Sequence, residues 1–214
     1  MTDLQLELAA RLVGASGAAG AGGSGSAGWW SDFTHGPTLW YANRATGVVL
    51  VGLLTLSTAI GVVSTARGGS ARWPRFATQA LHRNVSLLAM TMLALHVISA
   101  VVDTYVTIGW YEAFVPFVGT YKPLWLGLGA VSLDLLLAVV VTSLVRERLN
   151  HRRWRLIHVS SYLAWAIGVV HGIGIGTDAF TLWDLSVSVV SGVVVAVSVV
   201  VRLGTLVHER RLTV

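Results

Sequence analysis

The hydrophobic residues of this chain gather in five long segments, and the polar residues gather in the connections between them. The segments cover residues 39–65, 78–102, 124–145, 154–176 and 182–207. Each reaches or exceeds the roughly 20 residues that a helix needs to cross a bilayer. Helices are expected because lipid offers the backbone polar groups no other partner. The pattern predicts an all-α integral membrane protein with a bundle of about five transmembrane helices.

The first 38 residues differ in composition from the rest of the chain. Residues 14–28 read GASGAAGAGGSGSAG, a run typical of a flexible linker. This tail lacks the basic start and the long apolar stretch of a signal peptide. Aromatic residues at the edge of the first span predict a belt at the membrane interface: Trp29, Trp30, Trp40 and Tyr41. No internal sequence repeat is evident. We therefore expect an N-terminal tail (1–38), a transmembrane domain (39–207) and a short cytoplasmic tail (208–214).

The composition agrees with a membrane protein and restricts its chemistry. The chain is 54% hydrophobic and only 12% charged, whereas soluble domains carry about 25% charged residues. It has no cysteine, which excludes disulfides, thiolate zinc sites, iron–sulfur ligation by this chain and covalent haem attachment. Any haem is therefore of the b type. The net charge of +5 fits the basic loops of a membrane protein, so no nucleic-acid partner is expected.

The basic residues predict the orientation in the membrane. Twelve of the 15 Lys and Arg residues flank the first and third connections or follow the last span. The opposite face has only Arg11, Arg44 and Lys122, together with most of the acidic residues. Because cytoplasmic loops are enriched in Lys and Arg, we expect the N-terminus outside and the C-terminus inside the plasma membrane. An odd number of spans agrees with this topology.

Four histidines lie inside two of the apolar segments. His82 and His96 are separated by fourteen residues in the second segment, and His158 and His171 by thirteen in the fourth. At about 1.5 Å per residue, each pair spans roughly 20 Å along its helix. Ionisable residues in lipid are costly and mark functional sites. The matched depths suit two stacked b-type haems, His82 with His158 holding the inner one and His96 with His171 the outer one.

The facing of these histidines is less regular. At about 100° per residue, the two in the second segment return to within about 40° of each other, but those in the fourth differ by about 140°. This offset predicts a kink or a local change of winding in the fourth segment, for which Gly168, Gly172 and Gly174 offer sites.

Two other interpretations of the histidines stay open. A histidine in a membrane helix often serves only as the hydrogen-bond partner of a neighbouring helix. A metal or solute transporter also uses histidines, although carboxylate, Cys or Met ligands are then expected at the same level. Met90 and Met92 lie between the two levels. The histidines in predicted loops and tails receive no role: His35, His151 and His208.

The two histidine segments also carry a family resemblance. LHRNVSLLAMTMLALH (81–96) and RLIHVSSYLAWAIGVVH (155–171) resemble the transmembrane domain of ferric reductases, NADPH oxidases and the bacterial haem-binding subunit of a methionine-sulfoxide reductase system. In that superfamily such pairs ligate two b-type haems, so the resemblance implies this role for His82, His96, His158 and His171. The resemblance covers about residues 39–207. LWYANRATG (39–47) and PLWLGLG (123–129) resemble short actinobacterial ferric reductase-like proteins.

The chain departs from that superfamily in two ways. Many members have six helices, and the first of these is missing here. Oxidases and eukaryotic ferric reductases continue into a flavin and nicotinamide domain, whereas only seven residues (208–214) follow the last predicted span. No G-x-G-x-x-G fingerprint occurs in a strand–helix setting. We therefore expect electrons from a separate donor, which would be a flavoprotein, an NAD(P)H-linked reductase or a quinol.

Four further polar residues are candidates for supporting roles. Arg83 and Arg155 lie near the inner histidines, where they either pair with haem propionates or simply flank the membrane. Arg44 lies where the resemblance implies a basic residue near the outer haem, on the acceptor side. Asp134 lies mid-span in the third segment, where a carboxylate is costly. It is expected to be protonated, to bond across helices or to serve a proton path.

These features predict a dihaem protein that passes electrons across the membrane from a cytoplasmic donor to an extracytoplasmic acceptor. A ferric chelate, oxygen or a partner flavoprotein would be that acceptor. Histidine on both sides of each iron favours outer-sphere transfer. Whether the chain is an enzyme, as an oxidoreductase component without its own flavin domain, stays open. The alternatives are a non-enzymatic haem-binding subunit or sensor, and a transporter with structural histidines.

Overall fold

The structure, a computed structural model, describes residues 37–64, 74–176 and 181–212. The predicted N-terminal linker and the basic residues Arg67 and Arg72 lie outside these ranges. Every regular element within them is helical: α3 (Pro37–Ser64), α4 (Arg75–Val102), α5 (Trp110–Phe114), α6 (Pro123–Leu144), the 3-10 helix η1 (Arg146–Arg148), α7 (His151–Ile175) and α8 (Leu182–Leu212).

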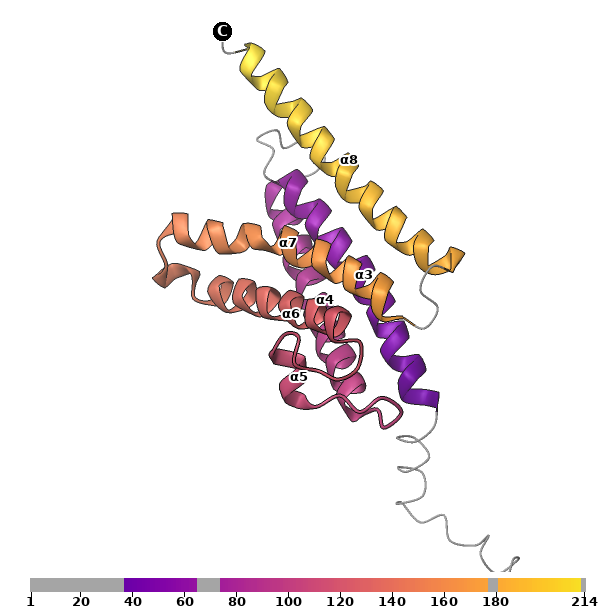
Figure 1. Ribbon diagram of the computed structural model, residues 1–214. Coiled ribbons are helices and arrows are strands. Elements are labelled where there is room, and N and C mark those ends of the chain that lie inside the picture. Colours follow the sequence, from indigo (N-terminus) through magenta and orange to yellow (C-terminus); the bar gives the residue numbers. More distant parts are fainter. Residues whose placement is uncertain (1–36, 65–73, 177–180, 213–214) are drawn as a thin grey trace, which may run out of the picture.

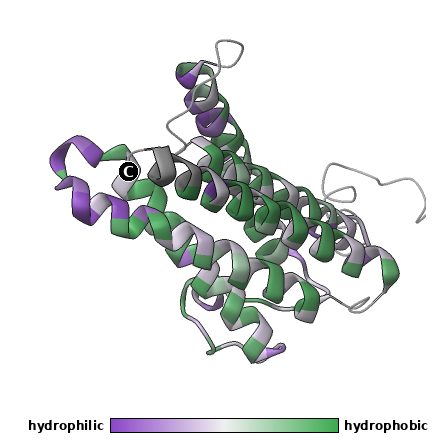
Figure 2. Cartoon of the chain, turned by 90° about the horizontal axis from the view of Figure 1, so that it is seen from above, coloured by the Kyte–Doolittle hydropathy of each residue, from purple (hydrophilic) through white to green (hydrophobic). Residues whose placement is uncertain are grey.

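Five of these helices are long and apolar enough to cross a membrane, which confirms the predicted spans. Their ends fall within a few residues of the predicted ones, and α8 extends further toward the C-terminus. Figure 2 shows hydrophobic residues along the long helices and hydrophilic residues gathered near helix ends and connections. The short helices α5 and η1 were not predicted, because neither is long enough to show a periodic pattern.

The ends of α6 and α7 follow from local chemistry. Pro123 occupies the first turn of α6, where a missing backbone N–H costs nothing. The Asn150 side chain caps α7 by accepting a hydrogen bond from the backbone N–H of Arg152 at 2.9 Å. The short η1 segment between them reverses the chain, so α6 and α7 form an antiparallel hairpin.

Two antiparallel hairpins make up the bundle. Helices α3 and α4 pack closely against each other, as do α6 and α7, and α8 packs mainly against α3. The two hairpins cross at an angle, and the end of the second hairpin that carries the connection between α6 and α7 projects away from α3 (Figure 1). The small helix α5 packs on α6, where buried Glu112 accepts hydrogen bonds from the Tyr111 hydroxyl and the Gly109 backbone N–H. The bond to Glu112 raises the pKa of Tyr111.

The centre of the bundle is a small apolar cluster. It draws on all four hairpin helices and consists of Leu50, Ala89, Leu93, Leu133, Leu136 and Ala164. Ala89 lies midway between the two histidines of α4, and Ala164, fully buried, lies close to midway between those of α7. The cluster therefore separates the two histidine levels with close-packed hydrocarbon. We call it the central plug.

Candidate functional site

The first pair of histidines is brought together across the two hairpins. The rings of His82 on α4 and His158 on α7 have centroids 6.3 Å apart and planes inclined at 72°. Two imidazole nitrogens bound to opposite sides of one metal at about 2.0 Å, each about 1.1 Å from its ring centre, put the centroids about 6 Å apart. The spacing of His82 and His158, an edge-to-face ring pair, is therefore also compatible with two axial ligands of a single iron.

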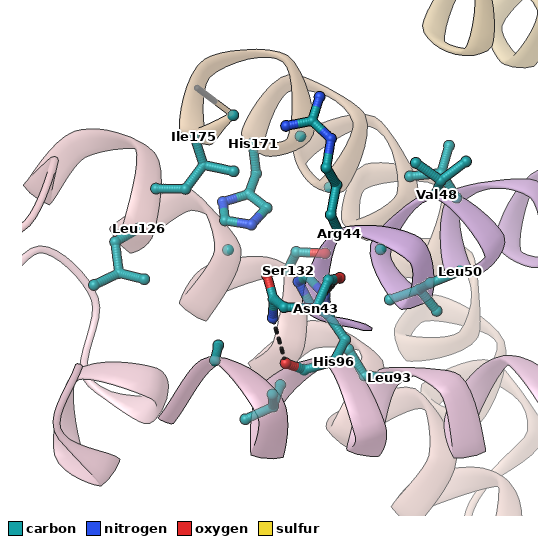
Figure 3. A pocket seen from close by; sticks show the side chains of 18 of the residues that line it. Asn43, Arg44, Val48, Leu50, Leu93, His96, Leu126, Ser132, His171 and Ile175 are labelled. Carbon is teal, nitrogen blue, oxygen red and sulfur yellow. Dashed lines mark hydrogen bonds between the residues drawn. The ribbon is translucent and has the colours of Figure 1, made fainter. Parts of the chain in front are cut away.

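The second pair lines a cavity on the other side of the central plug. His96 and His171 both face a space of about 260 Å³, which is close to the lower end of ligand-site volumes. Figure 3 shows His171 from α7 and His96 from α4 at this cavity, with Arg44 from α3 beside it. The floor of the cavity is formed by plug residues, including Leu50, Leu93, Leu133 and Leu136. The structure thus places the four predicted histidines at two separate levels.

Three of the four imidazoles are oriented in the same way. Each donates its Nδ1–H to a backbone carbonyl on the first helix of its own hairpin: His96 to Asn43 at 3.0 Å, His82 to Ser57 at 3.0 Å, and His171 to Trp125 at 2.7 Å. A carbonyl can only accept, so Nδ1 carries the proton and Nε2 keeps a free lone pair. Metal-ligating histidines are commonly fixed in this way, with the second nitrogen bonded to a carbonyl or carboxylate.

Each of these rings lies against a glycine four residues after the accepting carbonyl. An added Cβ would come within 3.1 Å of the His96 ring at Gly47, 3.4 Å of the His82 ring at Gly61 and 2.6 Å of the His171 ring at Gly129. In an α-helix each Cβ tilts toward the N-terminus, so a side chain covers the turn before it. Glycine leaves that turn bare, and the imidazole can reach the carbonyl.

Further hydrogen bonds hold the backbone close to His96 and His171. The Asn43 amide donates to the backbone carbonyl of His96 at 2.8 Å and to Ser99 Oγ at 3.3 Å. On the other hairpin, the Lys122 ammonium donates to three carbonyls at the end of α7: Gly174 at 3.3 Å, Ile175 at 3.2 Å and Gly176 at 3.3 Å. A cation at a helix C-terminus satisfies carbonyls that have no partner in the helix. Lys122 thus anchors the turn that follows His171.

His158 is the exception among the four. Its Nδ1 is buried and has no hydrogen-bond partner among the described residues. Its ring stacks on Trp154, with centroids 5.0 Å apart and planes inclined at 22°. This orientation also accounts for the thirteen-residue offset on α7, since His171 lies against α6 while His158 lies against Trp154 and His82.

The fourth segment, in which we predict a kink or a local change of winding, forms a single helix. Helix α7 runs without interruption from His151 to Ile175. Two of its glycines serve close packing instead: a Cβ at Gly168 would lie 3.1 Å from Ser132 Oγ, and Gly174 receives the ring of Trp125. The two imidazoles point to different neighbours, His171 to the Trp125 carbonyl and His158 to Trp154 and His82.

The remaining predicted residues lie around the two levels. Arg83 and Arg155 are exposed, next to His82 and one turn before His158. The Arg44 guanidinium lies over two indoles of the cavity wall, 4.6 Å from the Trp183 ring centroid and 5.4 Å from that of Trp40. Asp134 is exposed on α6 and forms no hydrogen bond or ion pair with the described residues.

Several residues of the site were not found from the sequence. The accepting carbonyls of Asn43, Ser57 and Trp125 belong to the backbone, so their side chains carry no signal of the role. The glycines give a signal in retrospect, because Gly47 and Gly61 are separated by the same fourteen residues as His82 and His96. Two glycines on one span and two histidines on the next that share the same separation would have predicted that the imidazoles pack on the glycines.

The arrangement fits two axial-ligand pairs better than a closed ion site. Among the described residues, no group of three or more His, Asp or Glu side chains converges on one point. Each level offers two imidazoles from different hairpins. A b-type haem with bis-histidine ligation would take two such axial nitrogens, because its porphyrin supplies the other ligands.

The comparison with protein families identifies the chain. Residues 38–178 match a family described as a domain of unknown function (DUF8596), and the chain belongs to that family. The matched region contains all four membrane histidines and helices α4 to α7. No curated protein and no solved structure matches the chain, and no ferric reductase family is identified.

Proposed function

We propose that this protein carries electrons across a membrane on two b-type haems, one held by His82 and His158 and the other by His96 and His171. Haem iron supplies a one-electron carrier at each level. The chain supplies the axial imidazoles and the apolar surroundings that tune the potential. The resemblance of the histidine segments to ferric reductases and NADPH oxidases agrees with this proposal.

The observation that carries the proposal is the spacing of His82 and His158. Their ring centroids are 6.3 Å apart although the residues come from different hairpins. A histidine that only joins two helices needs one hydrogen bond, such as the bond that His82 makes from α4 to α3. Here His82 already donates to the Ser57 carbonyl on its own hairpin, which leaves Nε2 for another ligand.

The central plug favours electrons over ions as the transported species. Six apolar side chains close the bundle between the two histidine levels. An ion or a polar solute needs a continuous polar route through the membrane, because bare charges in hydrocarbon are costly. An electron needs no such route. The central plug is therefore our reason for preferring an electron carrier to a transporter of ions or polar solutes.

The basic residues support a cytoplasmic location for the His82–His158 end. The connection between α6 and α7 and the first turns of α7 carry five exposed arginines: Arg146, Arg148, Arg152, Arg153 and Arg155. Under the positive-inside rule this end faces the cytoplasm, with the N-terminus outside and the C-terminus inside. Electrons would enter here from a separate flavoprotein, NAD(P)H-linked reductase or quinol. They would leave from the His96–His171 level to an extracytoplasmic ferric chelate, oxygen or partner flavoprotein.

Arginines at both levels suit the carboxylates of bound haem or an anionic acceptor. Arg83 adjoins His82 in α4, Arg155 lies one turn before His158 in α7, and Arg44 lines the second cavity. The planar guanidinium pairs with carboxylates through two parallel hydrogen bonds. The Arg44 guanidinium lies over the Trp183 ring, 4.6 Å from its centroid.

The experiment that tests the proposal is an absorption spectrum of the purified protein, oxidised and then reduced with dithionite, with haem per chain measured as the pyridine haemochrome. Two low-spin b-type haems per chain are expected. His82→Ala and His158→Ala should each remove one haem, and it should be the same one. His96→Ala and His171→Ala should each remove the other.

His151→Ala is the matched control, because His151 is exposed on α7, seven residues before His158. It should keep both haems. A protein that binds no haem when expressed with ample supply would refute the proposal. Two haems without reduction of any extracytoplasmic acceptor would instead favour a haem-binding subunit or sensor.

A further inference from the structure

One carboxylate lies in the middle of a membrane span and points away from the bundle. Asp134 is eleven residues after Pro123, which begins α6, and ten before Leu144, which ends it. It is exposed, and within the described ranges no donor or cation meets it. Carboxylates inside a membrane almost always face the bundle interior or pair with another group, because a charge in hydrocarbon is costly. A single copy of the chain therefore leaves Asp134 without the partner that its depth calls for.

The packing of α6 shows which of its faces stays open. On one side, Ser132 donates a hydrogen bond to the Ala164 carbonyl of α7 at 2.9 Å. At about 100° per residue, Asp134 lies about 160° around the helix from Ser132, so it points away from α7. Gly127, two turns before Asp134 on the same face, receives the ring of Phe117 from the connection between α5 and α6. This face is thus covered near α5 and open from Asp134 onward.

The uncovered part of this face carries one carboxylate among apolar side chains. Its exposed residues follow one another at helical spacing: Asp134, Ala138, Val141 and Val145. We call these four residues the open face of α6. Ala138, one turn from Asp134, is small, and small residues let a second membrane helix come close.

A second copy of the chain meets the needs of the open face. Two copies inserted in the same direction form a closed dimer about a two-fold axis along the membrane normal, so their α6 helices run parallel. Residues next to the axis then meet their own counterparts at the same depth. A protonated carboxyl group both donates and accepts a hydrogen bond, so two such groups satisfy each other. One carboxyl group on an apolar face is therefore complementary to itself.

We propose that this protein forms a homodimer through the open face of α6, in which the Asp134 carboxyl groups of the two copies are hydrogen-bonded to each other at the two-fold axis. The hairpin that carries α6 projects from the rest of the bundle, so a second copy can approach it from the side (Figure 1). Burial of the carboxyl pair between two helices removes both groups from lipid. The inference does not depend on haem, because no membrane histidine belongs to the open face.

The first test is disulfide cross-linking of single-cysteine variants of the full chain in membranes, since the chain has no cysteine of its own. Ala138→Cys should form a covalent dimer on mild oxidation, because the two copies of this residue lie one turn from the paired carboxyl groups. Leu88→Cys is the matched control. Leu88 is also exposed in mid-span, next to Ala89 of the central plug, but it belongs to α4. It should stay monomeric.

Two substitutions at position 134 separate the carboxyl pair from general apolar contact. Asp134→Leu removes the hydrogen bonds and should weaken association about 10-fold. Asp134→Asn keeps a donor and an acceptor, so it should associate like wild type. Association is measured by energy transfer between copies labelled at Arg148→Cys, as the ratio of lipid to protein is raised. Arg148 is exposed in η1, outside the open face.

Each outcome decides for or against the inference. A monomer at all lipid ratios, or cross-linking of Ala138→Cys no stronger than that of Leu88→Cys, would overturn it. Unchanged association of the Asp134→Leu protein would overturn it as well, because the dimer would not then depend on the carboxyl pair. A cross-linked product that contains a different protein would assign the open face to another partner. These results are independent of haem content, so they stand apart from the test of the proposed function.

Discussion

The indole of Trp165 on α7 donates its Nε1–H to Thr55 Oγ1 on α3 at 3.0 Å, which ties the two hairpins together between the histidine levels. Thr55 is buried, and its hydroxyl donates a hydrogen bond to the Val51 carbonyl at 2.7 Å. The bond joins residues far apart in the sequence, next to the central plug. It therefore helps to fix the crossing of the hairpins on which both imidazole pairs depend.

Removing this bond should weaken the association of the hairpins without altering their helices. Thr55→Val keeps the shape of the side chain but leaves the Trp165 N–H unpaired in an apolar environment. We expect a loss of about 1 kcal/mol in the free energy of unfolding, within the range measured for hydrogen bonds between membrane helices. Unfolding in mixed micelles by SDS titration measures it.

Thr91→Val is the control for that experiment, because the Thr91 hydroxyl is exposed and bonds only to the Leu87 carbonyl of its own helix at 3.1 Å. It should change the stability little. Equal stability of the Thr55→Val protein and wild type would mean that the bond does not hold the hairpins together.

Alanine at the three contact glycines should displace the imidazoles in a graded way. The added Cβ would come within 2.6 Å of the ring at Gly129, 3.1 Å at Gly47 and 3.4 Å at Gly61. Contacts under about 3 Å force a neighbour to move, whereas 3.4 Å is ordinary van der Waals contact. We expect Gly129→Ala to lose the His96–His171 haem, Gly47→Ala to weaken it and Gly61→Ala to keep both haems.

The measurement for this series is haem per chain after purification. Gly52→Ala is the control, because a Cβ there would meet nothing within 4 Å and Gly52, exposed on α3, does not line the second cavity. If Gly129→Ala kept both haems with unchanged spectra, the close approach of the His171 ring to α6 would not matter for binding.

Lys122→Ala should loosen the end of α7. The Lys122 ammonium donates hydrogen bonds to three carbonyls just after His171, and the methyl side chain of alanine has no donor to replace them. Loss of a cation at a helix C-terminus costs about 1 kcal/mol in folding free energy. We expect faster hydrogen exchange in residues 172–176 and faster release of one haem, with the His82–His158 haem unaffected. Lys122→Arg, which keeps the charge, should behave more like wild type.

The orientation can be checked with single cysteines, because the chain has none of its own. Arg148 lies exposed between α6 and α7, and Tyr105 lies 82% exposed in the connection that follows α4. A thiol reagent that does not cross membranes should label Tyr105→Cys in intact cells. It should label Arg148→Cys only after the membrane is opened. The reverse pattern would invert the proposed direction of electron flow.

Arg44 should influence anionic acceptors through its charge. Arg44→Gln removes the cation beside the second cavity but keeps a polar side chain of similar reach. We expect slower reduction of a negatively charged ferric chelate and unchanged reduction of a neutral acceptor, measured after loading with dithionite. The difference should shrink at high ionic strength, because salt screens exposed charges. Equal rates with both acceptors would rule out a steering role.

The sequence alone determined the number of spans, their approximate ends and the matched depths of the four histidines. These features depend on hydrophobic length and helical rise, which act locally along the chain. The absence of a sequence repeat did not reveal that the two hairpins are alike in structure. The two hairpins repeat one arrangement of imidazole, carbonyl and small residue, which only a few positions encode, such as Gly47 and Gly129.

Only the tertiary structure decided which groups those histidines meet. The crossing of the hairpins placed His158 beside His82. Backbone carbonyls such as that of Trp125 became partners through the register of neighbouring helices. Every residue has a carbonyl, so no side chain reveals which one accepts. Asp134 likewise proved to be exposed, because the face a mid-span residue presents depends on where the other helices pack.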